Sequence, residues 1–194
     1  MIRNRIAESI SDSIAVKQHI LDNQDFINNI EAAAEMMVAA LRAGGRIHFC
    51  GNGGSAADAQ HLAAELSGRF YYDRPPLNAE ALHCNGSYLT AVANDYSYDE
   101  VYARLLRGTA RRGDVLVGIS TSGNSANILR AFEAARELGV QTIALTGESG
   151  GRMKSLADML LNVPSNDTPR IQECHILIGH IICELVEREM FPKG

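Results

Sequence analysis

The sequence has no apolar run close to the about 20 residues that a membrane-spanning helix needs, so we expect no membrane span. Its cysteines form no C-x-x-C pair. The first residues, M-I-R-N-R-I-A-E, have no apolar core of signal-peptide length, so a cytoplasmic protein is expected. The four cysteines are then expected to be structural thiols in a reducing compartment: Cys50, Cys84, Cys174 and Cys183.

An excess of basic residues is also missing. The 194 residues include 18 Lys and Arg against 23 Asp and Glu, which gives a net charge of −5. This balance argues against nucleic acid as the main ligand, because a phosphate backbone requires a basic face. The chain also has neither the G-x-G-x-x-G spacing of dinucleotide folds nor the Gly-Lys-Ser/Thr of nucleotide-triphosphate loops. Its length favours one domain over residues 1–194, without linkers or repeats.

Residues 1–43 have a helical pattern, interrupted near residues 23–25. Isoleucines recur at spacing four in the first part: Ile2, Ile6, Ile10 and Ile14. An amphipathic helix placed before the rest of a domain either serves oligomerisation or packs on its own domain. The pattern leaves both interpretations open.

From residue 44 to 194 the pattern predicts an α/β body with a closing helix. Strands are expected at 46–50, 79–83, 115–120, 142–146 and 159–163. Helices are expected at 55–67, 87–93, 98–111, 125–138, 153–156 and 168–190. The strands are short apolar runs rather than alternating ones, which is typical of a parallel sheet covered by helices on both faces.

Two predicted strands end in turns suited to ligand binding. The segment S-T-S-G-N-S-A-N follows the strand at 115–120 and carries four hydroxyls: Ser120, Thr121, Ser122 and Ser125. Hydroxyls and unpaired backbone N–H groups at a helix start can hold a phosphate without a metal, although such clusters are also ordinary turns.

The segment C-G-N-G-G-S follows the strand at 46–50 and contains Asn52, Gly53 and Gly54. Its glycines allow close approach to a ligand, and Ser55 is a natural residue to cap the next helix. In a parallel sheet both turns lie at the carboxyl edge, where ligands of such folds bind.

A metal site is one interpretation of four polar residues on two helices. His61 and Glu65 are four residues apart and share one helical face, while Gln172 and His180 lie on the closing helix. If these helices pack together, two nitrogens and two oxygens meet, a set that suits Zn²⁺ with one position left for substrate. Spacing alone favours the alternative, a surface His–Glu pair with His175 and His180 as core histidines.

The sequence pattern gives weaker support to the remaining polar residues as ligand contacts. Asn94 and Asp95 follow an apolar run and form either a turn or a ligand contact. Arg69, Arg74 and Arg170 can reach an anionic substrate, but solvated surface is their usual role. No Ser/His/Asp or Cys/His arrangement argues for hydrolysis.

Several long segments, in order along the whole chain, together resemble the sugar isomerase (SIS) domain family. They are C-G-N-G-G-S-A-A-D-A-Q-H-x-A-A-E, A-N-D-Y, D-V-L-V-G-I-S-T-S-G-N-S-A-N, A-L-T-G-E-S-G-G and R-I-Q-E-C-H. The resemblance implies a flavodoxin-like three-layer sandwich with an N-terminal helical extension. It also implies a homotetramer to which residues 1–43 contribute and whose active sites lie at subunit interfaces.

The activity that the resemblance implies is an aldose–ketose isomerisation. D-Sedoheptulose 7-phosphate becomes D-glycero-D-manno-heptose 7-phosphate through a cis-enediol(ate), on the way to the heptose of lipopolysaccharide core. Glu65 would move the proton between C1 and C2, and His180 would exchange protons with the sugar oxygens.

The resemblance also implies roles for the other candidate residues. The phosphate cradle would comprise Ser55, Ser120, Thr121, Ser122 and Ser125. The contacts to the open-chain sugar would be Asn52, Gly53, Gly54, Glu65, Asn94, Asp95 and Gln172. The ligands of one zinc ion per subunit would be His61, Glu65, Gln172 and His180.

Other members of the family are not enzymes. Some are tetrameric adaptors that bind the bacterial replication initiator, with the Gly-Gly and catalytic positions replaced, and others are sugar-phosphate sensor domains. This chain retains Gly53, Gly54, Glu65, Gln172 and His180 together. We therefore expect an enzyme, with the adaptor as the alternative.

Overall fold

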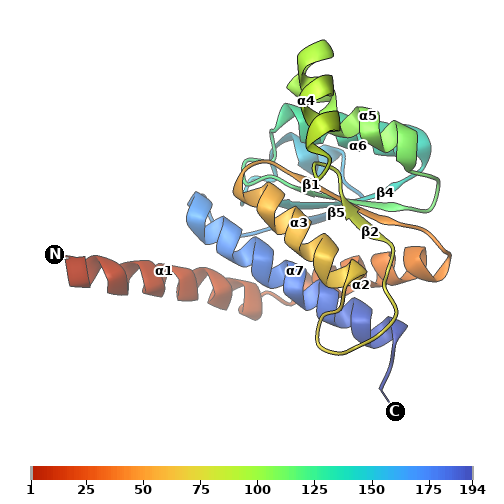
Figure 1. The fold of residues 1–194 in the computed structure, drawn as a ribbon. Coiled ribbons are helices and arrows are strands. Elements are labelled where there is room, and N and C mark those ends of the chain that lie inside the picture. Colours follow the sequence, from red (N-terminus) through yellow and green to blue (C-terminus); the bar gives the residue numbers. More distant parts are fainter. Residues whose placement is uncertain (1, 194) are drawn as a thin grey trace.

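A five-stranded parallel sheet forms the middle of three layers in the computed structural model, which describes residues 2–193 (Figure 1). The strand order is β2-β1-β3-β4-β5, and each pair of neighbours is parallel. The strands are β1 (Ile47–Gly51), β2 (Ala79–Ala81), β3 (Val115–Ile119), β4 (Gln141–Thr146) and β5 (Met159–Asn162). The predicted α/β class and all five expected strands are confirmed, with shifts of one or two residues at their ends.

Helices cover both faces of the sheet. They are α1 (Ile2–Asp22), α2 (Gln24–Arg42), α3 (Gly54–Ser67), α4 (Gly86–Asp95), α5 (Val101–Thr109), α6 (Ala126–Leu138) and α7 (Thr168–Met190). Two short 3₁₀ helices are η1 (Tyr98–Glu100) and η2 (Gly151–Ser155). The helix expected over 98–111 therefore begins as a 3₁₀ turn, and the one expected at 153–156 falls at the end of a 3₁₀ helix that stops at Ser155. None of the helices within residues 2–193 is both long and apolar enough to cross a membrane.

Side chains of β3 alternate between two hydrophobic cores. Val117 and Ile119 face the core that α2, α3 and α7 line, whereas Leu116 faces the core lined by α5 and α6. At Gly118 a Cβ atom would lie 2.3 Å from Cε2 of Phe132, so the missing side chain lets α6 approach the sheet. Because both faces of the strand are buried, its sequence is an unbroken apolar run.

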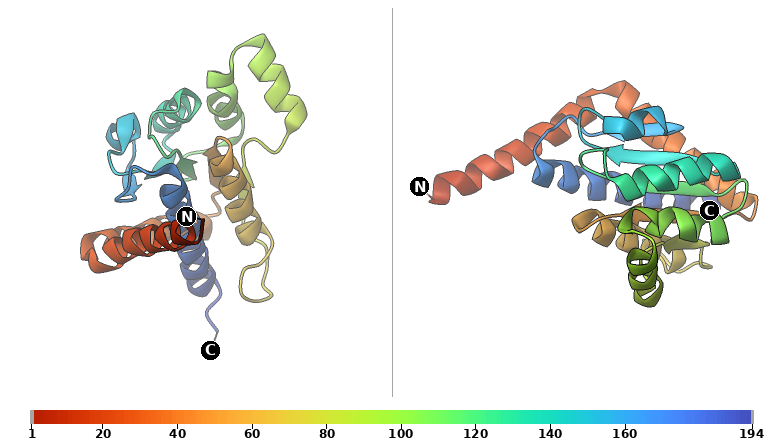
Figure 2. Two further views of the ribbon diagram at one scale, coloured as in Figure 1. Left: turned by 90° about the vertical axis from the view of Figure 1, so that its left-hand side faces the viewer. Right: turned by 90° about the horizontal axis from the view of Figure 1, so that it is seen from above.

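Helix α1 extends away from the body of the molecule (Figure 2). Its isoleucines at spacing four remain largely exposed, with fractions of 82% at Ile2, 56% at Ile6, 56% at Ile10 and 61% at Ile14. Near its middle, Ser13 donates a hydrogen bond of 2.6 Å to Glu173 of α7, and Ile20 joins the core. The isoleucine row therefore does not pack on its own domain, which leaves oligomerisation as the interpretation to test.

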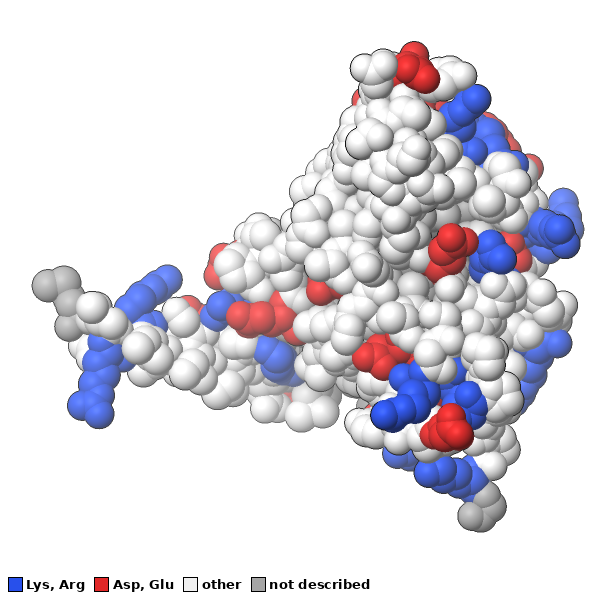
Figure 3. Space-filling model, viewed as in Figure 1, with Lys and Arg blue, Asp and Glu red and all other residues white. Residues whose placement is uncertain are grey.

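Charged residues of both signs are mixed on one face of the molecule. On the face viewed in Figure 3, blue and red atoms are interspersed around broad uncharged areas and no continuous basic stripe is present. This distribution agrees with the net charge of −5.

All four cysteines are free, and three of them are buried: Cys50, Cys174 and Cys183.

Helices α3 and α7 lie side by side and run in the same direction. Gly54 of α3 approaches Gln172 of α7, and further along Leu62 approaches Gly179. A Cβ atom on Gly179 would lie 2.5 Å from Cδ1 of Leu62, a side chain that is itself only 2% exposed. Close approach at this point requires glycine, and it brings the side chains next to Gly179 within reach of α3.

Substitution Gly179→Ala is therefore expected to destabilise the fold, by about 1–3 kcal/mol, because the buried Leu62 has little room to move. Gly108→Ala is the matched control, since Gly108 is also helical and a Cβ there meets nothing within 4 Å. That control should equal or slightly exceed the wild type in stability. Urea unfolding measures both, and equal stability of the two variants would contradict the packing argument.

Candidate active site

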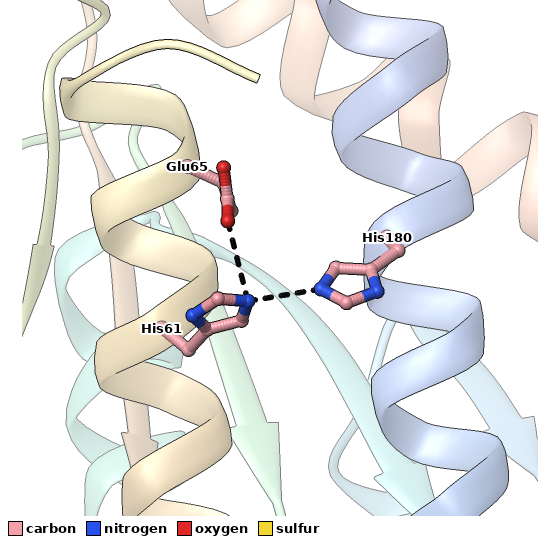
Figure 4. Close-up of side chains that lie close together, drawn as sticks. All are labelled: His61, Glu65 and His180. Atoms are coloured by element: carbon pink, nitrogen blue, oxygen red, sulfur yellow. Dashed lines mark hydrogen bonds and ion pairs between the residues drawn. The ribbon is translucent and has the colours of Figure 1, made fainter. Parts of the chain in front are cut away.

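Three side chains from α3 and α7 point toward one another (Figure 4). His61 Nε2 lies 3.0 Å from His180 Nε2 and 3.2 Å from Glu65 Oε1. Ligand atoms of all three residues lie within 4.8 Å of one another. His61 and Glu65 are one turn apart on α3, and His180 faces them from α7, so the pair is more than a surface contact within one helix.

The arrangement fits a small divalent cation. Zinc holds nitrogen and oxygen ligands at about 2.0–2.2 Å in a tetrahedron, which separates neighbouring ligand atoms by about 3.3 Å. The two distances of 3.0 and 3.2 Å are close to that value. His61 is 49% exposed and Glu65 is 21% exposed, so the group is open to a molecule from solvent. Two imidazoles and one carboxylate are also a donor set that zinc accepts.

Gln172 lies at a different point along the same two helices. Its Nε2 would be 2.8 Å from a Cβ atom on Gly54, at the start of α3. His180 is eight residues further along α7, or about 12 Å of helical rise. The structure thus brings together three of the four expected metal ligands, and Gln172 as the fourth stays a prediction.

Asp58 is a polar neighbour of this group that the sequence reasoning missed. It precedes His61 by one turn of α3 and is half-buried. Burial raises the pKa of its carboxyl group, and the nearby imidazoles of His61 and His180 oppose that shift. Its spacing of three residues from His61 was the available signal, but spacing alone does not separate such a residue from an ordinary surface carboxylate.

His175 is a core histidine, as one of the alternatives from the sequence held. It is fully buried on α7, and its Nε2 lies 3.0 Å from the backbone oxygen of Thr146. Burial lowers the pKa of His175 to about 4, although the hydrogen bond to Thr146 by itself would raise that pKa. His180, one turn and a half further on, instead lies in the polar group described above.

The turn after β1 is joined to α6 by a pair of side-chain amides. Asn52 donates from Nδ2 to Oδ1 of Asn127 at 2.9 Å, and Asn127 donates back to Asn52 at 2.8 Å. The hydroxyl of Tyr98 also donates to Asn52 Oδ1, at 3.2 Å. Asn127 is 3% exposed and fixes the orientation of Asn52. Asn127 ends the S-T-S-G-N-S-A-N segment, but no local pattern there indicates this contact.

The expectation that Ser55 caps α3 is wrong. The capping residue is Gly53, with φ of +56°, and the helix already begins at Gly54. Ser55 lies inside the first turn and is 4% exposed. The positive φ of Gly53 turns the chain from β1 into the helix two residues sooner than a cap at Ser55 would.

The turn after β3 places its hydroxyls at the start of α6. Ser120 Oγ and Ser125 Oγ are 2.9 Å apart, and Ser125 is the capping residue of the helix. Ser122 Oγ accepts a hydrogen bond of 3.2 Å from the backbone N–H of Asn124. Gly123, with φ of +64°, lets the turn pack against the segment at residues 150–153. A helix start lined by hydroxyls favours an anion such as phosphate.

Asn94 and Asp95 form the last residues of α4 rather than a turn after it. Both are exposed, and Asn94 Nδ2 donates to Asp95 Oδ1 at 2.9 Å. The segment that follows them returns to the site, since Tyr98 contacts Asn52. Their assignment as sugar contacts stays a prediction.

Two of the three arginines considered for substrate binding have structural partners. Arg74 forms an ion pair of 3.0 Å with Glu187, and both side chains are only 1% exposed. Arg170 binds Glu173 at 2.7 Å and also donates to the backbone of α1. Arg69 is exposed.

Comparison with known proteins assigns the chain to a family. Residues 10–147 match the model of the SIS domain, and the chain therefore belongs to the SIS domain family. The phosphoheptose isomerase of Mycobacterium bovis is 57% identical over 192 residues, which cover 98% of both chains. That of Sulfurimonas denitrificans is 51% identical over 193 residues, covering 100% of this chain and 99% of the other. The solved structure of phosphoheptose isomerase GmhA from Neisseria gonorrhoeae superposes with a TM-score of 0.91 at 45% identity, covering 96% of this chain and 99% of that one.

The buried His175 predicts how stability depends on pH. Its pKa of about 4 in the folded state is below the ordinary value of 6.5, so between these values the unfolded chain binds a proton that the folded chain does not. Stability should therefore fall as pH decreases through this window, by about 1.4 kcal/mol per pH unit from this residue.

The variant His175→Gln should show a smaller slope of unfolding free energy between pH 6.5 and pH 4, measured by urea unfolding at several pH values. His19→Gln removes an exposed histidine from α1 and should follow the wild type. An unchanged slope in the His175 variant would mean that other groups govern the acid sensitivity.

Proposed function

We propose that this protein is a phosphoheptose isomerase, which converts D-sedoheptulose 7-phosphate to D-glycero-D-manno-heptose 7-phosphate. The observation that carries the proposal is the group of His61, Glu65 and His180 in a chain that matches phosphoheptose isomerases over nearly its whole length. An acid–base pair within a candidate cation site can move a proton between two adjacent carbons.

The substrate is anchored by its phosphate at the turn after β3. Hydroxyl groups near the start of α6 are supplied by Ser120, Thr121, Ser122 and Ser125, and Ser55 adds one from the first turn of α3. Negative charge is favoured at the start of a helix. The open-chain sugar then extends past the turn after β1. Its contacts are Asn52, Gly53, Gly54, Asn94, Asp95 and Gln172.

Proton transfer involves two groups on facing helices. The carboxylate of Glu65 takes the proton from one of the carbons C1 and C2 and returns it to the other through a cis-enediol(ate). His180 exchanges protons with the sugar oxygens, including those needed for ring opening. One base suffices for the carbon proton, because C1 and C2 of a planar cis-enediol(ate) both present the same face to that base.

The metal of this proposal is one zinc ion per subunit, held by His61, Glu65 and His180. Gln172, about 12 Å of helical rise from His180, stays the predicted fourth ligand. When bound, zinc supplies a positive charge that stabilises the oxygen of an enediolate. A carboxylate that donates to zinc is a weaker base, so the proposal implies that Glu65 binds the metal loosely during turnover.

The assembly and cellular setting are part of the same proposal. A homotetramer would bury the exposed isoleucine row of α1, which includes Ile6 and Ile10, and would enclose the open side of the site. We place the enzyme in the cytoplasm, in the pathway to the heptose of lipopolysaccharide core. Neither nucleic acid nor membrane is a partner.

The non-catalytic adaptor that binds the replication initiator is not favoured. Glu65 and His180 both remain, and their ligand atoms lie together with that of His61. The relatives with high identity over nearly the full chain are phosphoheptose isomerases. An adaptor has no need of an acid–base pair beside a candidate metal site.

Turnover of sedoheptulose 7-phosphate by the purified protein tests the activity and the metal together. We expect isomerisation that a chelator abolishes and added Zn²⁺ restores, because zinc stabilises the charge that develops on the sugar oxygen. Activity that is indifferent to the chelator would retain the isomerase and remove the metal. No turnover in any condition would contradict the proposal and lead to a pull-down with the replication initiator.

Glu65→Gln separates the role of base from that of ligand. The amide cannot accept the carbon proton, so kcat should fall by at least about 100-fold. His61→Gln is the matched comparison, because it removes a ligand from the same face of α3 and leaves the base. Excess Zn²⁺ should partly restore the His61 variant but not the Glu65 variant. Near-normal turnover of the Glu65 variant would exclude this residue as the base.

A further inference from the structure

A buried ion pair that the proposed mechanism does not use lies directly behind the site. Arg74 Nε and Glu187 Oε1 are 3.0 Å apart, and each side chain is 1% exposed. The guanidinium of Arg74 also donates to four backbone oxygens: Glu65 at 2.8 Å, Leu66 at 2.7 Å, Gly68 at 3.1 Å and Pro75 at 3.1 Å. Arg74 therefore holds the end of α3 to the loop that follows it.

Glu187 anchors the same loop to α7. Its Oε1 accepts from the backbone N–H of Phe70 at 2.9 Å, and its Oε2 accepts from that of Tyr71 at 2.8 Å. Burial alone would raise the pKa of Glu187, but these two N–H groups and Arg74 outweigh it and lower the pKa. The carboxylate is thus satisfied on both oxygens, and it fixes the backbone at residues 70 and 71.

Fixing this backbone places an aromatic ring against the site. The ring of Phe70 lies over the imidazole of His180, with ring centroids 5.7 Å apart and planes inclined by 35°. The imidazole of His180 therefore contacts the ring of Phe70, and its Nε2 atom lies 3.0 Å from Nε2 of His61. An aromatic contact of this kind restricts the rotation of an imidazole at a partly exposed position.

We propose that Phe70 is a positioning residue, which holds the imidazole of His180 so that its Nε2 faces His61 and Glu65. The Arg74–Glu187 pair sets the position of Phe70 by fixing the loop between α3 and β2. This proposal rests on the function proposed above, because it concerns the same side chains. Its consequence for chemistry is that the shape of the group depends on an apolar residue outside the three candidate ligands.

The test uses two variants of Phe70 and one control. Phe70→Leu removes the ring and retains an apolar side chain, whereas Phe70→Tyr retains the ring. Tyr72→Phe is the control, since it removes different loop contacts, the hydrogen bonds from the Tyr72 hydroxyl to the backbone oxygens of Phe191 at 2.8 Å and Glu187 at 3.3 Å. That control loosens the loop but leaves Phe70 bound to Glu187.

Zinc affinity, measured by competition with a chromogenic chelator, is the first readout. Partners that orient metal ligands typically contribute 10-fold to 100-fold in affinity or activity. Phe70→Leu should lose roughly 10-fold or more in affinity and in kcat, with KM within about twofold. Phe70→Tyr and Tyr72→Phe should stay within about threefold of the wild type. Thermal unfolding checks that all three variants remain folded.

Crystal structures of the wild type and Phe70→Leu keep the proposal testable if the protein neither turns over this substrate nor binds zinc. In the variant, the separation of His61 Nε2 and His180 Nε2 should exceed the roughly 3.5 Å limit of a hydrogen bond. An unchanged imidazole in that structure would overturn the positioning role whatever the activity. Equal losses in Phe70→Leu and Tyr72→Phe would also overturn it, because they would trace the effect to loop stability.

Discussion

The close parallel packing of α3 against α7 is the contact on which the candidate site depends. Gly179 carries no side chain, so Leu62 can occupy the space beside it and the helices approach closely. His61 precedes Leu62 and His180 follows Gly179, and each therefore projects from the edge of the same contact. A distance of 3.0 Å between two imidazole nitrogens on different helices follows from backbone proximity rather than from either helix alone.

The parallel sheet makes the second contribution by placing two ligand turns at one edge. Because β1 and β3 are neighbours and run in the same direction, both of their carboxyl ends open toward α3 and α6. The reciprocal amides of Asn52 and Asn127 join the two turns, so that the turn proposed to contact the sugar lies beside the turn proposed to hold the phosphate.

A third element, the loop between α3 and β2, is held beside the site by the buried ion pair of Arg74 and Glu187. Burying Arg74 and Glu187 removes both from water, which is favourable only when their remaining hydrogen-bonding groups are satisfied. Four backbone oxygens and two backbone N–H groups meet that condition. An arginine that the sequence offered as a contact for an anionic substrate thus stabilises the backbone around the site instead.

Local patterns determined the secondary structure, because apolar periodicity and the glycine-rich turns act over a few residues. The closing helix is found at the predicted residues 168–190, and the His61–Glu65 pair shares a face as its spacing required. Only the tertiary structure decided which helices meet. It separated the core residue His175 from His180, placed Gln172 beside Gly54, and brought Asn127 and Phe70 to the site. These contacts join residues far apart in the sequence, and their distances depend on packing across the whole body, which no local pattern encodes.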